Sequence, residues 1–357
     1  MKFDIPPLKS ILFILLLSVQ FGYAQSVDTS LQLQTVEIIA PRLESFPIGT
    51  KTTTLNDFQK LSIQTEDLAT ALSLNTPIFI KNYGPGRLAT TSIRGASAAQ
   101  AAVIWNGFNI NSPMLGQTDF SLIPAFFIDE IGLQYGSNST AWGSGAIGGS
   151  VILENKNSFN RGWQALWDNK TGSFDNFFNG VGVGYSNERF STSTKVFYES
   201  GQNDFPILNG QSDRLLHSEL SKWGVLQKNG FKINNKQQLE LNVWYQDTDR
   251  NLPPNLVQRN SEATQADESL RTTLNWKYIA RNSILQVRNG LFYERLFFQD
   301  PSANIDSRSR TWTNRTEVEW TKTITPNHSL NIGANYCLLY TSPSPRDATL
   351  SRMPSSA

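Results

Sequence analysis

Between residues 163 and 336 the chain alternates apolar and polar side chains in segment after segment, and this period of two constrains the fold more than any other feature. Residues 239–245 carry apolar side chains at odd positions, and polar residues such as Glu240 and Gln246 fill most even positions. The same alternation recurs over residues 270–278, 312–320 and 330–336. Neighbouring side chains of a β-strand point to opposite faces, so these segments predict strands with one apolar and one polar face.

A soluble β-sandwich alternates in the same way, but two further features favour a barrel whose apolar face meets lipid. Aromatic residues stand near the ends of the predicted strands, at Trp163, Tyr185, Phe190, Tyr198, Tyr278, Trp312, Trp320 and Tyr336. Short connections at residues 186–189, 234–236, 280–282 and 325–327 alternate with long ones at 201–213, 248–267 and 299–307. Outer-membrane barrels show this asymmetry, with aromatic girdles, tight periplasmic turns and long extracellular loops. The pattern predicts about nine strands of a transmembrane antiparallel β-barrel.

The N-terminus has the composition of a secretory signal peptide. Lys2 and Lys9 accompany an apolar run at residues 11–19, and small residues lead to a predicted cleavage site after Ala24. The run is too short to span a bilayer, which takes about 20 apolar residues, so residues 1–24 predict export. The alternative is a buried core helix. No cysteine follows the run, which excludes a lipoprotein anchor on the new N-terminus.

Charge and cysteine content exclude other classes of protein. The formal net charge is +1 and both signs are mixed along the chain, so nothing marks a surface that binds nucleic acid. Cys337 is the single cysteine, so no disulfide can form within the chain.

The sequence contains partial matches to enzyme motifs, but each lacks the surrounding elements or partner residues that the motif requires. Gly143, Gly145 and Gly148 fit a GxGxxG pattern, yet no βαβ unit surrounds them, and they are better explained as flexible backbone. His217 and His328 are far apart, and no HExxH or GxSxG sequence is present to build a metal or nucleophile site. We therefore expect no enzymatic activity, no catalytic metal and no cofactor.

Three ordered motifs precede the alternating segments. SIRG stands at residues 92–95, WNG at 105–107, and IDEIGLQYGSNSTAWGSGAIGGSVIL at 128–153. Together they resemble the plug domain of TonB-dependent outer-membrane receptors. The resemblance implies an α+β plug domain at residues 42–155, followed by the N-terminal part of a transmembrane antiparallel β-barrel at 156–336. Barrels of this family have about 22 strands around a plugged lumen, so the strands predicted here form an incomplete barrel.

After Tyr336 the alternation stops, and the chain ends in CLLYTSPSPRDATLSRMPSSA. We interpret residues 337–357 as a foreign or artefactual tail, and the chain as the first half of a longer receptor. A genuine short protein would leave an unpaired strand edge in lipid, where unsatisfied backbone groups are costly.

Residues 25–41 contain a segment that resembles the TonB box, which adds as a strand to a sheet of the energy-transducing TonB protein. Its β-branched residues favour an extended backbone, and Pro41 keeps the residue before it extended. An ordinary strand is the alternative. The residues expected to bind TonB are Gln34, Thr35, Val36, Glu37, Ile38, Ile39 and Ala40.

Within the plug, the resemblance places Arg94 and Gly95 in an element that packs against the barrel wall. Arg94 is expected either to latch the plug to barrel carboxylates or to make an ion pair with no role in transport. Asn106-Gly107 predicts a hairpin turn, and the loop after it, at 109–119, resembles the apex that touches ligand in this family. The candidates for substrate contact are Asn109, Asn111, Ser112, Met114 and Gln117.

Acidic residues fall on or beside the predicted extracellular loops, at Asp204, Asp213, Asp247, Asp249 and Asp267. Resemblance to cobalamin receptors makes calcium a candidate there, since hard cations prefer carboxylate and carbonyl oxygens. No DxDxDG-like spacing occurs, and solvated aspartates are the alternative.

The resemblance implies an energy-coupled importer of a scarce, bulky nutrient in the outer membrane of a Gram-negative bacterium. Cobalamin is the first candidate and a ferric siderophore the second. The expected partners are TonB, outer-membrane lipid and the small-molecule nutrient. The competing hypothesis is an outer-membrane binding or adhesion barrel without energised transport, which would need no TonB box.

Overall fold

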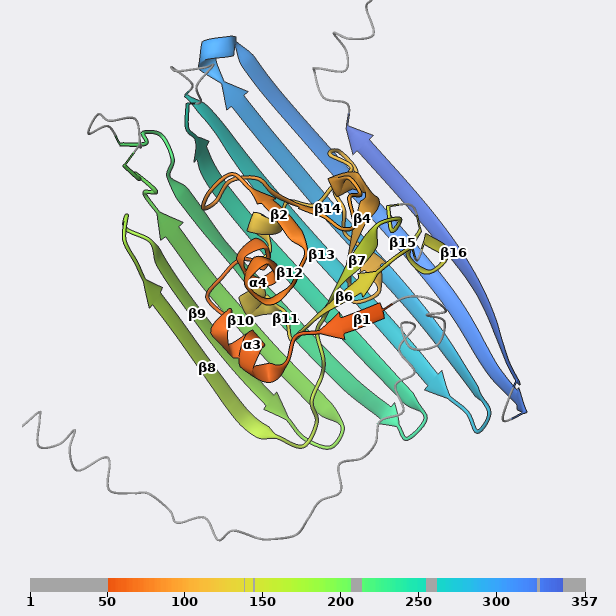
Figure 1. The fold of residues 1–357 in the computed structure, drawn as a ribbon. Helices are drawn as coiled ribbons and strands as arrows, with labels where there is room; N and C mark the ends of the chain where they lie inside the picture. The colour runs from red at the N-terminus through yellow and green to blue at the C-terminus, as the bar shows by residue number, and fades with distance from the viewer. Residues whose placement is uncertain are drawn as a thin grey trace, which may run out of the picture. The chain divides into compact units, whose positions relative to one another are not determined.

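The computed structural model describes residues 51–137, 139–143, 145–206, 214–254, 262–325 and 328–342. The predicted signal peptide and the predicted TonB box lie outside these residues. The described residues form three sheets, of five, two and nine strands. Figure 1 shows the smaller sheets and the helices, in red to yellow, against the strands of the large sheet.

The five-stranded sheet is the centre of the plug. Its strands lie in the order β1 (Lys51–Thr54), β6 (Glu130–Tyr135), β7 (Gly149–Glu154), β4 (Ala101–Trp105) and β5 (Phe108–Asn109). β4 reads AAVIW, is buried along its whole length and runs parallel to β7, whereas the other pairs are antiparallel. Asn106 and Gly107 have φ values of 47° and 90° between β4 and β5, so the predicted Asn-Gly hairpin turn is confirmed.

Short helices and a two-stranded sheet complete the plug. Their bounds are α3 (Asp57–Ser62), α4 (Leu68–Asn75), β2 (Phe79–Asn82), β3 (Ala89–Ser92), η2 (Ala98–Gln100), η3 (Phe120–Leu122), η4 (Ala125–Phe127) and α5 (Ser139–Trp142). Asn56 begins α3 with a capping box to Gln59, and Asp67 begins α4 by accepting from the backbone N–H of Thr70. Among the described residues, no helix is long and apolar enough to cross a membrane.

The large sheet consists of successive antiparallel hairpins. Its strands are β8 (Gly162–Thr171), β9 (Phe177–Ser186), β10 (Phe190–Gly201), β11 (Leu220–Asn234), β12 (Gln237–Leu252), β13 (Ala263–Ile279), β14 (Ser283–Asp300), β15 (Ile305–Thr325) and β16 (His328–Ser342). Each pairs with the next in chain order, so β8 and β16 form the edges of the described sheet. The prediction of an α+β plug followed by about nine barrel strands is confirmed.

Three predicted boundaries were wrong. The connections predicted at residues 248–267 and 299–307 are shorter, because β12 continues to Leu252, β13 begins at Ala263 and β14 continues to Asp300. The barrel strands also do not stop at Tyr336, since Ser342 of β16 still pairs with Arg310 of β15. The predicted foreign origin of residues 337–357 stays a prediction, and 343–357 lie outside the described residues.

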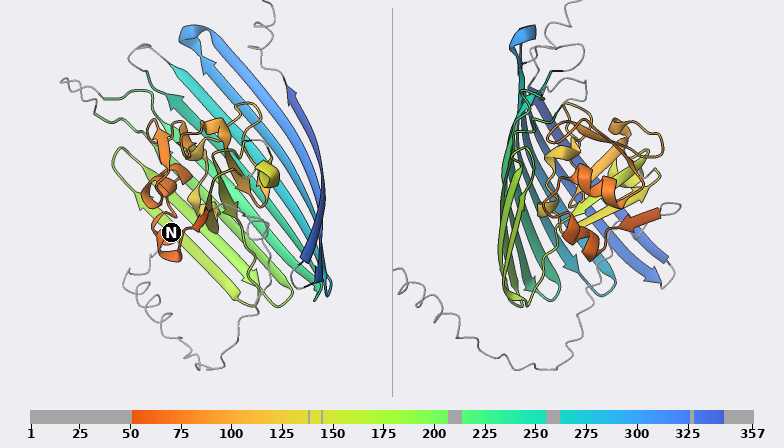
Figure 2. Two further views of the ribbon diagram at one scale, coloured as in Figure 1. Left: turned by 45° about the vertical axis from the view of Figure 1, so that its right-hand side comes forward. Right: turned by 60° about the vertical axis from the view of Figure 1, so that its left-hand side comes forward.

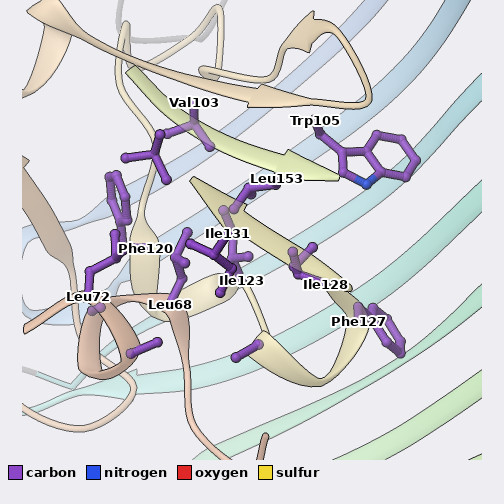
Figure 3. Packing of buried hydrophobic residues seen from close by; sticks show 14 of the residues in the cluster. Leu68, Leu72, Val103, Trp105, Phe120, Ile123, Phe127, Ile128, Ile131 and Leu153 are labelled. Atoms are coloured by element: carbon purple, nitrogen blue, oxygen red, sulfur yellow. The ribbon is translucent and has the colours of Figure 1, made fainter. Parts of the chain in front are cut away.

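The plug packs against one face of the large sheet, as the right-hand view of Figure 2 shows. Alternate residues of β12 are buried on this face, from Asn242 to Arg250. Trp244 among them is 0% exposed, and its ring lies 5.4 Å from that of Trp105 and 5.9 Å from that of Phe127. Figure 3 shows Trp105 and Phe127 at one end of the apolar core of the plug. One continuous cluster of buried side chains therefore joins the plug to the strands.

Replacing Trp244 with alanine should loosen the plug from the strands. Truncating a fully buried aromatic side chain costs about 3–5 kcal/mol, because it removes contacts and leaves a cavity. We expect a lower urea midpoint by near-UV circular dichroism. Trp163, which is 77% exposed, supplies the matched control, and equal losses for Trp244→Ala and Trp163→Ala would contradict the packing.

Candidate functional site

The plug is held to the strands by a group of buried polar contacts around η3. We call it the η3 latch and define it as Asp119, Ser121 and Leu122 of the plug with Lys222, Gln246 and Arg250 of β11 and β12. At its centre, Nη1 of Arg250 donates to Oδ2 of Asp119 at 2.8 Å, and the two side chains are 4% and 3% exposed. The pair is therefore almost fully removed from water.

Asp119 also organises the plug around this ion pair. Its Oδ1 accepts from the backbone N–H groups of Ala89 at 2.9 Å and Ser121 at 3.1 Å, and from the Ser121 hydroxyl at 2.8 Å. Arg250 donates in addition to the carbonyl of Gly86 at 3.1 Å. Two plug segments that are separate in sequence, residues 86–89 and 119–121, therefore meet at one ion pair.

The remaining contacts of the latch fix the backbone of η3. Nζ of Lys222 donates to the Ser121 carbonyl at 3.1 Å and pairs with Glu199 of β10 at 2.7 Å, with the lysine side chain only 1% exposed. Nε2 of Gln246 donates to the Leu122 carbonyl at 2.5 Å. Side chains of the neighbouring strands β11 and β12 thus donate hydrogen bonds to successive carbonyls of η3.

A second anchor lies at Asp129, just before β6. Its carboxylate pairs with Lys195 of β10 at 3.0 Å and with Lys228 of β11. Lys195 also donates to the Phe126 carbonyl at 2.9 Å, and Lys228 to the Lys156 carbonyl at 3.2 Å. Burial raises the pKa of the Asp129 carboxyl, but Lys195 and Lys228 outweigh burial and leave that pKa below its ordinary value. The carboxylate is therefore charged at neutral pH.

Further contacts join the plug to strands on both sides of these anchors. Glu66 pairs with Lys170 of β8 at 2.5 Å. The Asn109 carbonyl accepts from Arg315 of β15 at 3.1 Å. Since the plug strands and the barrel strands belong to different sheets, all of these contacts can break without opening a β-ladder.

Residues 42–150 match the family model described as TonB-dependent Receptor Plug Domain. The vitamin B12 transporter BtuB of Vibrio vulnificus is 28% identical over 144 residues, which cover 39% of this chain and 23% of that protein. The vitamin B12 transporter BtuB of Photobacterium profundum is 34% identical over 92 residues, which cover 26% of this chain and 15% of that protein. The matched residues thus span less than a quarter of these relatives.

Solved structures show the same arrangement of plug and strands. The FrpB iron transporter from Neisseria meningitidis (F3-3 variant) has a TM-score of 0.68 at 15% identity, covering 85% of this chain and 52% of that one. The siderophore receptor PiuA from Acinetobacter baumannii has a TM-score of 0.63 at 15% identity, covering 82% of this chain and 46% of that one.

The chain thus has the plug domain and part of the barrel of a TonB-dependent receptor. Its location is the outer membrane of Gram-negative bacteria, as predicted. The relatives of this receptor are transporters and receptors, in agreement with the prediction that it is not an enzyme.

The structure places the predicted latch residue of the receptor away from the barrel contacts. Arg94 follows β3 in a turn with φ 53°, its side chain is exposed, and its guanidinium lies 5.8 Å from the ring centroid of Tyr135, within the plug. Among the described residues, the ion pairs between plug and strands are made by Glu66, Asp119 and Asp129 instead. A latch role for Arg94 and Gly95 stays a prediction.

The loop at residues 109–119 is only partly available for substrate contact. Both amide atoms of Asn111 are engaged, because Oδ1 accepts from Val103 N–H at 2.9 Å and Nδ2 donates to the Ala101 carbonyl at 3.0 Å. Asn109 Oδ1 accepts from Asn111 N–H at 2.9 Å. The remaining candidates, Ser112 and Met114, are half-buried, Gln117 lies beside them, and Leu115 is 48% exposed. Substrate contact by this loop stays a prediction.

The aspartates proposed for calcium do not form a group of three or more possible metal ligands within the described residues. Asp247, Asp249 and Asp267 lie on strands rather than in loops, which corrects the prediction of their positions. Asp204 pairs with Arg214, and Asp267 pairs with Arg250 of the η3 latch at 3.2 Å. Asp213 lies outside the described residues, where the structure gives no position for it. Calcium binding stays an untested expectation.

The sequence carried one overlooked signal for the anchors. Lys195, Lys228 and Arg250 are cations on the inward face of predicted strands, where the alternation allows polar residues but gives no reason for long charged ones. Their partners could not be found from spacing, since Asp119 and Arg250 are 131 residues apart.

Removing the central cation of the η3 latch should release the plug locally. Arg250→Met leaves Asp119 and Asp267 as buried carboxylates without their partner, which costs about 3–5 kcal/mol. We expect tryptic cleavage after Arg87, beside the latch, to accelerate about tenfold or more, because cleavage follows the population of the open state.

Arg214 provides the matched control for this experiment, since it pairs with Asp204 at an exposed site. An exposed ion pair contributes only about 0–1 kcal/mol, so Arg214→Met should cleave at nearly the wild-type rate. Unchanged cleavage of Arg250→Met would show that the ion pair does not hold the plug.

The helix cap at Asp67 should make the stability of the plug depend on pH. Burial raises the pKa of Asp67 to about 6 from an ordinary 3.8, against the opposing effects of Lys222 and the Thr70 hydrogen bond. Between these values the folded protein keeps a proton that the unfolded chain has released, so the free energy of unfolding falls as pH rises. Asp67→Asn keeps an acceptor for Thr70 and should flatten this decline in thermal midpoints between about pH 4 and pH 6.

Asp57→Asn is the control for the pH experiment. Asp57 is exposed, and its hydrogen bond to Lys60 lowers its pKa, so its removal should leave the decline between about pH 4 and pH 6 in place. A decline that is the same in wild type and Asp67→Asn would assign the pH dependence to another group.

Proposed function

We propose that this receptor imports a scarce, bulky nutrient by an energy-coupled rearrangement of its plug. The observation that carries the proposal is the attachment of the plug: within the described residues, its strands form sheets of their own, and side-chain contacts hold them to the barrel strands. Such an attachment is strong in the resting state and can be released by a pull on a neighbouring segment.

The proposed pull acts through residues 34–40. An extended segment that adds as a strand to a TonB sheet is held by main-chain hydrogen bonds, which resist force along the strand. The segment precedes β1, and β1 pairs with β6 directly after the Asp129 anchor. Tension on β1 would therefore reach the Asp129 anchor first, through β6.

Cobalamin is the substrate we propose first. The curated relatives that match this chain are named vitamin B12 transporters, at 28% and 34% identity over the matched residues. Ferric siderophores are the second candidate, since PiuA is named a siderophore receptor, although at 15% identity it supports the fold rather than the ligand.

The loop at residues 109–119 is the plug surface that we propose for substrate contact. Its tip at Leu115 and Gly116 is exposed, and Gly116 has φ 68°, so a side chain there would be strained. Asn111 supports the proposal indirectly, because its side-chain amide binds β4 and fixes the base of the loop. Ser112, Met114 and Gln117 then lie between this fixed base and the exposed tip, or beside the tip.

Uptake of labelled cobalamin by cells that express this receptor from its own locus tests the proposal. Val36→Pro removes a backbone donor from the proposed TonB-binding strand, so we expect uptake to fall to the level of cells without TonB, with surface binding of cobalamin unchanged. Val36→Ala keeps the donor and serves as the control, with uptake near that of wild type.

Two results would count against the proposal in different ways. Uptake by Val36→Pro at the wild-type rate would reject the TonB-binding segment. Binding of neither cobalamin nor ferric siderophores by wild-type cells would reject the proposed substrates and leave the plug mechanism to be tested with other nutrients.

A further inference from the structure

The outward face of β14 and β15 carries three arginines, which belong to two successive outward-facing residue pairs of these strands. Arg295 lies directly opposite Arg310, and Arg308 lies opposite Phe297 in the next outward pair. We call Arg295, Arg308 and Arg310 the arginine patch. The two strands are labelled in Figure 1, on the side of the sheet that ends with β16.

The plug contacts show which face the patch occupies. Arg315 of β15 donates to the plug at Asn109, and Phe292 of β14 packs against Phe108 with ring centroids 6.0 Å apart, so these residues point inward. Side chains alternate between the two faces along a strand. Arg310 is an odd number of residues from Arg315, and Arg295 an odd number from Phe292, so both arginines point outward. In an outer-membrane protein that face meets lipid.

The position of the patch relative to the membrane follows from the neighbouring pair of aromatic residues. Tyr293 and Trp312 are the outward pair next to Arg295 and Arg310 on the side of the short turns, with ring centroids 4.5 Å apart. Aromatic pairs of this kind mark the boundary between hydrocarbon and headgroups. β14 and β15 continue beyond the patch to η5 (Pro301–Ala303), so the patch lies at headgroup height on the extracellular side.

Within the described residues, Arg295 and Arg308 each have a carboxylate partner and Arg310 has none. The outward row continues from Arg295 to Glu268 and Asp247, so its acidic side chains lie on the β13 side, away from Arg310. Arg295 pairs with Glu268 at 3.0 Å, and Arg308 pairs with Asp306 at 3.2 Å while its guanidinium lies 5.0 Å from the Phe297 ring centroid. Arg310 is exposed and has no ion pair among the residues that the structure describes. Like charges directly opposite each other destabilise a strand pair, so an anion at Arg310 would relieve the repulsion from Arg295.

We propose that the arginine patch binds a phosphate group of an outer-leaflet lipid, with Arg310 as its principal ligand. A guanidinium at headgroup height can donate two parallel hydrogen bonds to a phosphate while Tyr293 and Trp312 pack on the acyl chains below. Arg308, stacked on Phe297, supplies a second donor from the side of the extracellular loops. The bound lipid would fix the height of β14 and β15 in the membrane.

Native mass spectrometry of the detergent-solubilised receptor tests this site. The probes are diphosphoryl lipid A and the same lipid with its phosphates removed. We expect the phosphorylated lipid to bind wild type about tenfold more tightly, and Arg310→Gln to lose most of that preference, as expected for one charge-assisted contact. Arg310→Lys keeps the charge without the planar fork and should restore part of it.

Arg189→Gln is the matched control, because it removes an exposed arginine from the short turn between β9 and β10 at the other end of the sheet. It should bind both lipids as wild type does. Equal binding of the two lipids by wild type, or equal losses in Arg189→Gln and Arg310→Gln, would overturn the site. Displacement of the lipid by millimolar inorganic phosphate would show an anion site that does not require a lipid, and would overturn the assignment to the membrane.

Discussion

The burial of Arg250 between the plug and the strands is the constraint on which the rest of the account depends. A guanidinium that is 4% exposed is stable only beside counter-charges, and here Asp119 and Asp267 supply them from opposite sides of the boundary. Asp119 is in turn held by the N–H groups of Ala89 and Ser121, so the charge network also fixes the plug loops. If the plug moved away, Asp119 would be withdrawn and Arg250 would keep only Asp267 as a counter-charge. The resting arrangement is therefore specific as well as stable.

The division into separate sheets makes the same boundary releasable. Within β11 and β12 each residue is held by a continuous ladder of backbone hydrogen bonds, whereas the plug meets these strands through individual side chains and an aromatic cluster around Trp244. Contacts of this kind break one group at a time. We propose that this construction lets the strands stay intact in lipid while the plug changes position, as energy-coupled import would require.

The sequence predicted the strands well where one face meets lipid and poorly where it does not. Alternation at residues 239–245 located β12 and its outward face, but β12 and β13 continue past that region with Asp247 and Glu268 on the outward face too. Above the lipid both faces are polar, so the alternation disappears while the pairing continues, and the loops were predicted too long. Trp244, on the face predicted as polar, is buried because the plug covers it. Partners such as Asp119 and Arg250 come from distant segments and required the fold.

Hydrogen exchange of the native receptor, followed by mass spectrometry at increasing urea, tests most directly the claim that plug and strands are separable units. We expect amides of β4 and β7 to become exchangeable together at a lower urea concentration than amides of β11 and β12, since the plug should open as a unit while the barrel ladder persists. Simultaneous exchange of both groups in one transition would contradict it, and would mean that the plug is an inseparable part of the barrel.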